Sequence, residues 1–198
     1  MQSMKGALTV LAYDPGFADT GWARLSVMRV ATGIHLTPLG MGCTTTQKAK
    51  GKVLVETDRL RRAGLQADQF RQQMDLVTPN CVVLETPSHV RNAPVMFVQG
   101  ITYGVIVGLA RDRGIPYLLA DAQNTKLQVA GFRTASKRDV QDALDARFKM
   151  SLSTEFLGGV NAGRWEHPYD ALAAAVSALE SDLLKILLSQ LPVMEVPT

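Results

Sequence analysis

Apolar residues along the chain form two kinds of run: short ones typical of buried strands and longer periodic ones typical of helices. The short runs predict strands near residues 7–13, 20–28, 34–44, 81–85 and 116–120. The longer runs predict helices near residues 54–77, 94–113, 136–148 and 168–190, with a frayed tail from about 191. Early antiparallel strands followed by alternating strands and helices are typical of a mixed sheet flanked by helices. We therefore expect an α/β fold.

Two of the predicted strands end in a carboxylate. The run LTVLAY is followed by Asp14 and Pro15, and proline cannot continue a strand ladder. The run CVVL ends in Glu85, two residues before Pro87. The carboxyl ends of strands carry the chemistry of open α/β sheets. Taken alone, the first motif is an ordinary turn and Glu85 a solvent-facing strand end.

A third segment opens the last predicted helix. His167 and Asp170 are three residues apart and so share a helix face, and Pro168 suits a first helical turn. Carboxylates, and to a lesser degree imidazoles, bind hard divalent cations. A capping role for His167 and a favourable helix-dipole position for Asp170 are the structural alternatives. The conjunction of the three segments favours a metal site.

Composition limits the remaining possibilities. The 198 residues suit one substantial domain, and 46% of them are hydrophobic. The net charge is only +3, so a phosphate-binding face must come from the placement of basic residues. The basic clusters are Lys48, Lys50 and Lys52; Arg59, Arg61 and Arg62; and Arg133, Lys137 and Arg138. Such clusters are usually solvated faces, but Ser136 is a predicted N-cap that would place Lys137 at an anion-favouring helix N-terminus.

The two cysteines, Cys43 and Cys81, lack the spacing of a metal site. Buried thiols in a reducing cytoplasm are the simplest interpretation. The first residues contain no signal-peptide pattern.

The order of these segments resembles that of the RuvC-type Holliday junction resolvases, members of the RNase H-like superfamily. The similarity runs from about Leu8 to Leu179. It is carried by YDPGFADTG, VVLE with the following Asn92, VMFVQGITYGVIVGLARDRG, PYLLADAQNTKLQVAGFRTASKRDVQDAL and HPYDALAAA. The resemblance implies an RNase H-like mixed five-stranded sheet flanked by helices, as a single RuvC-like nuclease domain over residues 1–198.

The resemblance also implies a chemistry. The metal-site positions of the family correspond to Asp14, Glu85, His167 and Asp170, which would hold two Mg²⁺ ions, with Mn²⁺ able to substitute. Some members have Asp at the position of His167. Basic residues near the scissile phosphate correspond to Lys126 and Lys137. The expected reaction is a pair of symmetric nicks in four-way junction DNA that leave 5′-phosphate and 3′-hydroxyl ends, in the cytoplasm of a bacterial cell, with a bacteriophage source plausible.

The family acts as homodimers, and the glycine-containing apolar stretch offers a surface for pairing. Gly100, Gly104 and Gly108 lie on one helical face and allow close approach, either to the protein's own sheet or to a second copy. The resemblance favours the second copy. Gln99 interrupts the stretch and charges end it before ~20 apolar residues, so we expect no membrane span.

The chain departs from the family in the loop after Glu85. Members often carry an aromatic residue there that stacks on opened bases, whereas TPSHVRNAP contains none. His89 or Arg91 would be the replacement, since both have planar side chains, although His89 has an equally good interpretation as an exposed loop residue. Arg133 and Arg138 complete the expected DNA-binding set.

Two other functions remain open. An actin- or sugar-kinase-like ATPase also begins with a strand, an acidic residue and a glycine-containing turn, but it would need further phosphate loops. ATP hydrolysis without DNA would favour it. A non-catalytic module that binds branched DNA would bind junctions with or without Mg²⁺ and leave them intact.

Overall fold

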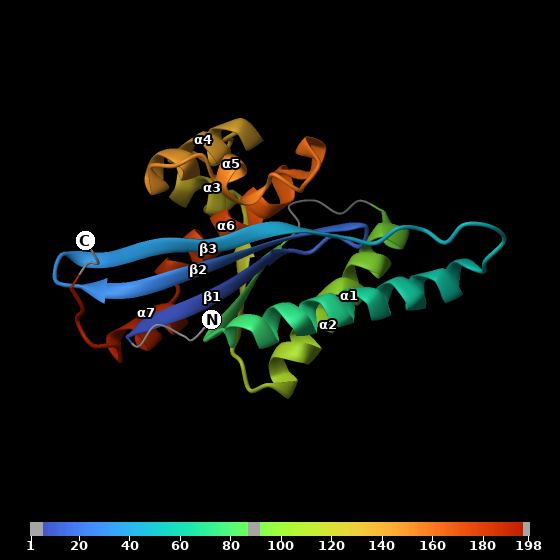
Figure 1. Cartoon of the computed structure of the whole chain (residues 1–198), viewed down its shortest axis with the longest axis horizontal. Coiled ribbons are helices and arrows are strands. Elements are labelled where there is room, and N and C mark those ends of the chain that lie inside the picture. The colour runs from blue at the N-terminus through green and yellow to red at the C-terminus, as the bar shows by residue number, and fades with distance from the viewer. Residues whose placement is uncertain (1–5, 87–91, 196–198) are drawn as a thin grey trace.

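Figure 1 shows a computed structural model in which one five-stranded sheet lies between two sets of helices; it describes residues 6–86 and 92–195. The strand order is β3-β2-β1-β4-β5. β1 pairs antiparallel with β2, as β2 does with β3, whereas β4 runs parallel to β1 and to β5. The strands are β1 (Ala7–Asp14), β2 (Asp19–Val30), β3 (Gly33–Thr45), β4 (Cys81–Thr86) and β5 (Tyr117–Asp121). The predicted mixed sheet is confirmed.

The helices divide between the two faces of the sheet, with α1 and α2 on one face and α3 to α6 on the other (Figure 1). The first two are α1 (Val55–Val77) and α2 (Ala93–Asp112). The others are α3 (Ala122–Ala130), α4 (Lys137–Phe148), α5 (Leu152–Phe156), α6 (Glu166–Ser177) and α7 (Asp182–Ser189), with single 3₁₀ turns η1 (Ala162–Arg164) and η2 (Ala178–Glu180).

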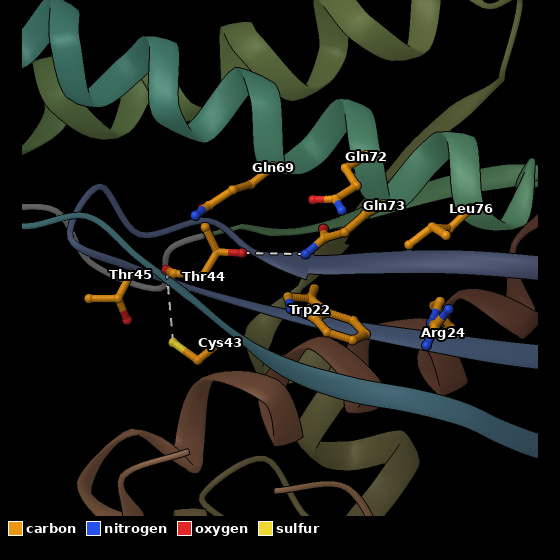
Figure 2. Close-up of a pocket in the computed structure, with 9 residues that line it drawn as sticks. All are labelled: Trp22, Arg24, Cys43, Thr44, Thr45, Gln69, Gln72, Gln73 and Leu76. Carbon is orange, nitrogen blue, oxygen red and sulfur yellow. Dashed lines mark hydrogen bonds between the residues drawn. The ribbon is translucent and has the colours of Figure 1, made fainter. Parts of the chain in front are cut away.

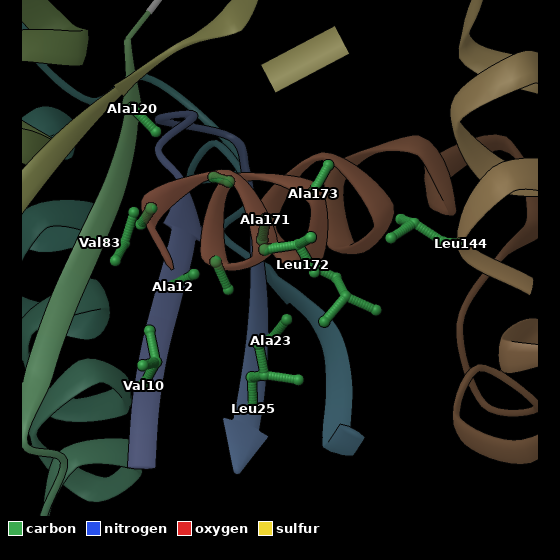
Figure 3. Close-up of a cluster of buried hydrophobic side chains, with 14 of the residues drawn as sticks. Val10, Ala12, Ala23, Leu25, Val83, Ala120, Leu144, Ala171, Leu172 and Ala173 are labelled. Atoms are coloured by element: carbon green, nitrogen blue, oxygen red, sulfur yellow. The ribbon is translucent and has the colours of Figure 1, made fainter. Parts of the chain in front are cut away.

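Each face of the sheet has its own apolar cluster. On one face α6 crosses the strands, and its small side chains Ala171 and Ala173 belong to the same apolar cluster as Ala12 and Ala23 of the sheet (Figure 3). Alanine leaves little volume between helix and strands, so α6 approaches the sheet closely. On the other face Phe70 of α1 and strand residues such as Leu11 form the second cluster. The sheet is therefore covered on both faces, as parallel strands require.

Helix α2 buries little of its apolar surface. By length and hydropathy alone it is the one helix in the described residues that could cross a membrane, yet only 17% of its most apolar stretch is buried. A Cβ atom added at Gly100, Gly104 or Gly108 would meet nothing within 4 Å. Within residues 6–86 and 92–195, the glycine stripe therefore does not serve close packing.

The structure departs from the sequence-based expectations at several places, among them the short helix α5, which was not predicted. Helix α3 was not predicted, although Asp121 caps its start by accepting a hydrogen bond from Asn124 N (2.8 Å), and Gly131 ends it with φ +90°. The helix predicted over 168–190 is interrupted, because Ser181 is extended and caps α7. The tail is not free from residue 191, since Met194 N donates to Arg29 O (2.8 Å).

Candidate metal centre

Asp14 ends β1 directly opposite Gly21 of β2. A Cβ atom at Gly21 would lie 2.0 Å from the carbonyl oxygen of His167 and 2.6 Å from Pro168 N. Only glycine therefore allows the first turn of α6 to lie against β2 beside Asp14. Gly21 lies inside β2, within the strand predicted near residues 20–28. The available signal was a glycine within a strand, which often marks close approach of another backbone.

Three carboxylates meet at this edge of the sheet. Asp14, Glu85 and Asp170 each offer an oxygen atom, and these atoms lie within 4.8 Å of one another. They come from the ends of β1 and β4, which are parallel neighbours, and from the first turns of α6. The structure thus brings together three of the four predicted metal ligands.

The carboxylates perturb one another strongly. Burial, together with the charges of Asp170 and Asp14, raises the pKa of Glu85 to about 9. Burial and the charge of Asp14 raise the pKa of Asp170 to about 7. Without a cation, the cluster therefore holds protons at neutral pH.

His167 lies beside the cluster and contacts Asp14 directly. Its Nδ1 is 2.6 Å from Asp14 Oδ2. This hydrogen bond raises the pKa of His167, while burial acts against the shift. The imidazole is thus placed to orient Asp14, and its expected role as a metal ligand stays a prediction.

Both predicted lysines are close enough to influence the cluster. Lys126 on α3 and Lys137 at the start of α4 each lower the pKa of Glu85 by their charge, although less than burial raises it. Lys137 pairs with Glu166. Partial burial opposes the charge of Lys137, but the hydrogen bond and ion pair with Glu166 raise its pKa.

The predicted cap of α4 is confirmed. The backbone N–H of Asp139 donates to Ser136 Oγ (3.2 Å), and the backbone N–H of Ser136 donates to Asp139 Oδ2 (2.8 Å). This capping box places Lys137 in the first turn of the helix, as expected.

The expected DNA-contacting residues are spread more widely. His89 and Arg91 lie outside the described residues. Arg133 is exposed beyond α3, and Arg138 is exposed on α4, where it pairs with Asp142 at 3.0 Å. Their roles stay predictions.

The buried guanidinium of Arg62 holds the turn after Asp14. Arg62 of α1 is only 6% exposed and donates to Phe17 O (3.2 Å) and Thr46 O (3.2 Å). Its guanidinium also lies 4.3 Å from the centre of the Phe17 ring. Arg62 therefore does not belong to a DNA-facing basic cluster, because its donors are used inside the protein.

A separate groove lies beneath α1, on the sheet face opposite α6, and is drawn in Figure 2. It has a volume of about 320 Å³. It is lined on one side by α1 and on the other by β2 and β3: Gln69, Gln72, Gln73 and Leu76 on α1, and Trp22, Arg24, Cys43, Thr44 and Thr45 on the strands. None of these residues belongs to the carboxylate cluster.

Neither cysteine is in a disulfide, in agreement with the sequence analysis. Cys81 is buried and Cys43 is half-buried. Burial raises the pKa of both thiols, that of Cys81 to about 12.

Curated proteins with similar sequences share one name. The crossover junction endodeoxyribonuclease RuvC of Protochlamydia amoebophila is 28% identical over 185 residues, which cover 92% of this chain and 96% of the relative. The protein of the same name from Corynebacterium efficiens is 25% identical over 169 residues, which cover 85% of this chain and 67% of that relative. No protein-family model matches the sequence.

Solved structures share the fold. Thermus thermophilus RuvC in complex with Holliday junction substrate superposes with a TM-score of 0.68 at 19% identity, covering 86% of this chain and 92% of the other. The yeast mitochondrial Holliday junction resolvase Ydc2 gives a TM-score of 0.55 at 14% identity, with 89% and 78% covered. Over most of its length the chain is thus similar in sequence to RuvC-type Holliday junction resolvases, and it shares the fold of their solved structures.

Proposed function

We propose that this protein is a metal-dependent endonuclease that resolves four-way DNA junctions by paired symmetric nicks. The observation that carries the proposal is the meeting of Asp14, Glu85 and Asp170 at one edge of the sheet, from three segments far apart in sequence. The names of the curated relatives and the junction-bound structural neighbour support the same reaction and substrate. The products would carry 5′-phosphate and 3′-hydroxyl ends.

The donor set suits a hard divalent cation. Carboxylate oxygens are the preferred ligands of Mg²⁺ and Mn²⁺, and the mutual repulsion that raises the pKa values of Glu85 and Asp170 would be relieved by a cation. We propose Mg²⁺ as the ion, two per site, held by the three carboxylates with His167 at the edge. A pair of such ions supplies an activated water and stabilisation of the leaving 3′ oxygen.

The remaining side chains would act on the DNA and on the ligands. Lys126 and Lys137 lie where their charge would offset the charge that develops on the phosphate. Lys137 must exchange its pairing with Glu166 for the phosphate. His167, through its contact with Asp14, would hold that carboxylate in one orientation. Arg133 and Arg138, with His89 and Arg91, are proposed to contact the arms and centre of the junction.

We further propose that two chains pair through the exposed face of α2. That face carries the glycine stripe and the exposed Phe97, and Val95 and Met96 are exposed in the first turn of the helix. The opposite face of α2 is held to α1 by a buried hydrogen bond between Thr102 and Gln66 (3.2 Å), which a helix crossing a bilayer would lose. This exposed surface is therefore better suited to contact a second copy of the chain than lipid. We accordingly propose the cytoplasm as the location of the protein.

The decisive experiment compares an end-labelled mobile four-way junction with a linear duplex of the same sequence, each with Mg²⁺, Mn²⁺ or EDTA. Symmetric nicks in the junction alone, dependent on metal, are expected. Tight junction binding without cutting under any metal would favour the non-catalytic module. If the protein neither binds nor cuts, ATP hydrolysis becomes the next activity to measure.

The variant Asp14→Asn provides the matched control. It keeps the shape of the side chain and removes its charge, so we expect cutting to fall by at least about 10³-fold while junction binding changes little. Loss of junction binding together with cutting, in a protein that is still folded, would mean that Asp14 has a structural role instead.

A further inference from the structure

Helix α2 contacts the backbone of both carboxylate-bearing segments. Gln99 Nε2 donates to the carbonyl oxygen of Pro15 (3.3 Å), the residue after Asp14. One turn later, the Tyr103 hydroxyl donates to the carbonyl oxygen of Glu85. The two side chains are four residues apart and so project from the same face of the helix. A single rigid element thus binds the ends of β1 and β4.

A second, fully buried link joins α2 to the same turn through α1. Thr102 Oγ1 donates to Gln66 Oε1 (3.2 Å), and Gln66 Nε2 donates to Gly16 O (3.1 Å) and Phe17 O (3.2 Å). Thr102 and Gln66 have no exposed surface. In such an environment a lost partner leaves a buried polar group unsatisfied, so the connection holds the turn firmly.

These contacts act against the repulsion within the carboxylate cluster. Asp14 and Glu85 repel each other, and they lie just beyond Tyr13 and Leu84, the last paired residues of β1 and β4. The contacts of α2 hold the two backbones at the point where the pairing of the strands ends. Metal affinity depends on holding ligands at the right separation before the ion arrives, and the partners that orient them are known to matter for that reason.

We propose that α2 sets the separation of the Asp14 and Glu85 carboxylates, with Tyr103 and Thr102 as positioning residues. The glycine stripe lies on the opposite face of α2. A second chain that pairs there would therefore contact the same helix that holds the Asp14 and Glu85 backbones. The inference rests on the proposed function, since it concerns the metal site of the same reaction.

The test measures metal binding separately from cutting. Metal-free protein is titrated with Mn²⁺ by calorimetry, without DNA, for the wild type, Tyr103→Phe, Thr102→Val and Thr102→Ser. Tyr103→Phe removes only the hydroxyl, and Thr102→Ser restores the donor that valine lacks. We expect Tyr103→Phe and Thr102→Val to weaken Mn²⁺ binding by about tenfold or more, and Thr102→Ser to bind as the wild type does.

Tyr117→Phe on β5 is the matched control, since Tyr117 is a partly exposed tyrosine on a strand that carries none of the three carboxylates. Thermal unfolding and junction binding are measured in parallel, because a purely structural role would lower Tm without changing Mn²⁺ affinity. Unchanged Mn²⁺ affinity in folded Tyr103→Phe overturns the inference, even where Thr102→Val fails to fold.

The two proposals fail in different ways. A wild type that cuts junctions while Tyr103→Phe binds Mn²⁺ normally keeps the proposed function and removes the role of α2. A wild type that binds Mn²⁺ through these residues but cuts no junction supports the role of α2 and contradicts the proposed function. A wild type that binds no Mn²⁺ at all contradicts both.

Discussion

At the scale of single residues, burial and mutual repulsion both disfavour the ionised form of the carboxylates in the site. Asp14, Glu85 and Asp170 lie close enough to share an ion. In the metal-free protein, bound protons reduce the repulsion among the carboxylates, as the raised pKa values of Glu85 and Asp170 indicate. Metal and protons should therefore compete for the cluster, and metal affinity should rise with pH.

The raised pKa of Glu85 predicts a pH-dependent cost to folding. Its folded pKa of about 9 lies above the ordinary value of 4.5 for a glutamate, so between these values the folded state binds more protons and stability falls as pH rises. In EDTA, Glu85→Gln should raise stability at pH 8 by about 2 kcal/mol, roughly 4–8 °C in Tm. Near pH 4 the two proteins should unfold alike. A variant less stable than the wild type at pH 8 would contradict this account.

The protonation of His167 predicts how the cutting rate falls at acidic pH. A protonated imidazole cannot ligate a metal, and the hydrogen bond to Asp14 raises the pKa of His167. Cutting by the wild type should therefore fall on acidification at a higher pH than cutting by His167→Asp. Single-turnover rates on saturating junction between pH 5 and 8 measure both limbs. Identical limbs would remove His167 from the set of ligands.

At the scale of elements, the position of α6 depends on one residue that lacks a side chain. Gly21→Ala would place a methyl group 2.0 Å from the carbonyl oxygen of His167, and that backbone has to move. We expect a loss of at least about 2 kcal/mol in unfolding free energy and loss of Mn²⁺ binding, measured by thermal unfolding and calorimetry.

The control for this prediction is a glycine with open space around it. Gly64 lies inside α1, and a Cβ atom there would meet nothing within 4 Å. Gly64→Ala should stabilise the protein by about 0.5–1 kcal/mol, because alanine favours the helix. Equal effects of the two substitutions would show that the close approach of α6 to Gly21 is not required.

Element boundaries were predictable where the local pattern was strong. All five predicted strands and the first two long helices are found at their expected places, because buried runs and helical periodicity are local properties. Helix α3 was missed because its nine residues are too few for a clear period, and only Asp121 and Gly131 marked its ends. The last helix was predicted as continuous because the restart at Ser181 interrupts no apolar period.

At the scale of the whole molecule, the exposed apolar face of α2 predicts an assembly. Gly104→Arg places a long charged side chain on the glycine stripe, in open space in the single chain. The variant should fold normally but sediment as a monomer, whereas the wild type is expected to sediment as a dimer. By the role proposed for α2, it should also bind Mn²⁺ more weakly. A variant that remains dimeric would move the interface elsewhere.

The sequence alone determined the α/β order of the elements and the three segments that carry Asp14, Glu85 and Asp170, because strand endings and helix starts leave local marks. Only the tertiary structure decided how these segments meet. The missing side chain of Gly21 admits α6, and the buried Arg62 and Gln66 bind the backbone of the turn after Asp14 instead of facing solvent. Such contacts join residues distant in sequence, so they follow from packing and from the satisfaction of buried polar groups, which no local pattern records.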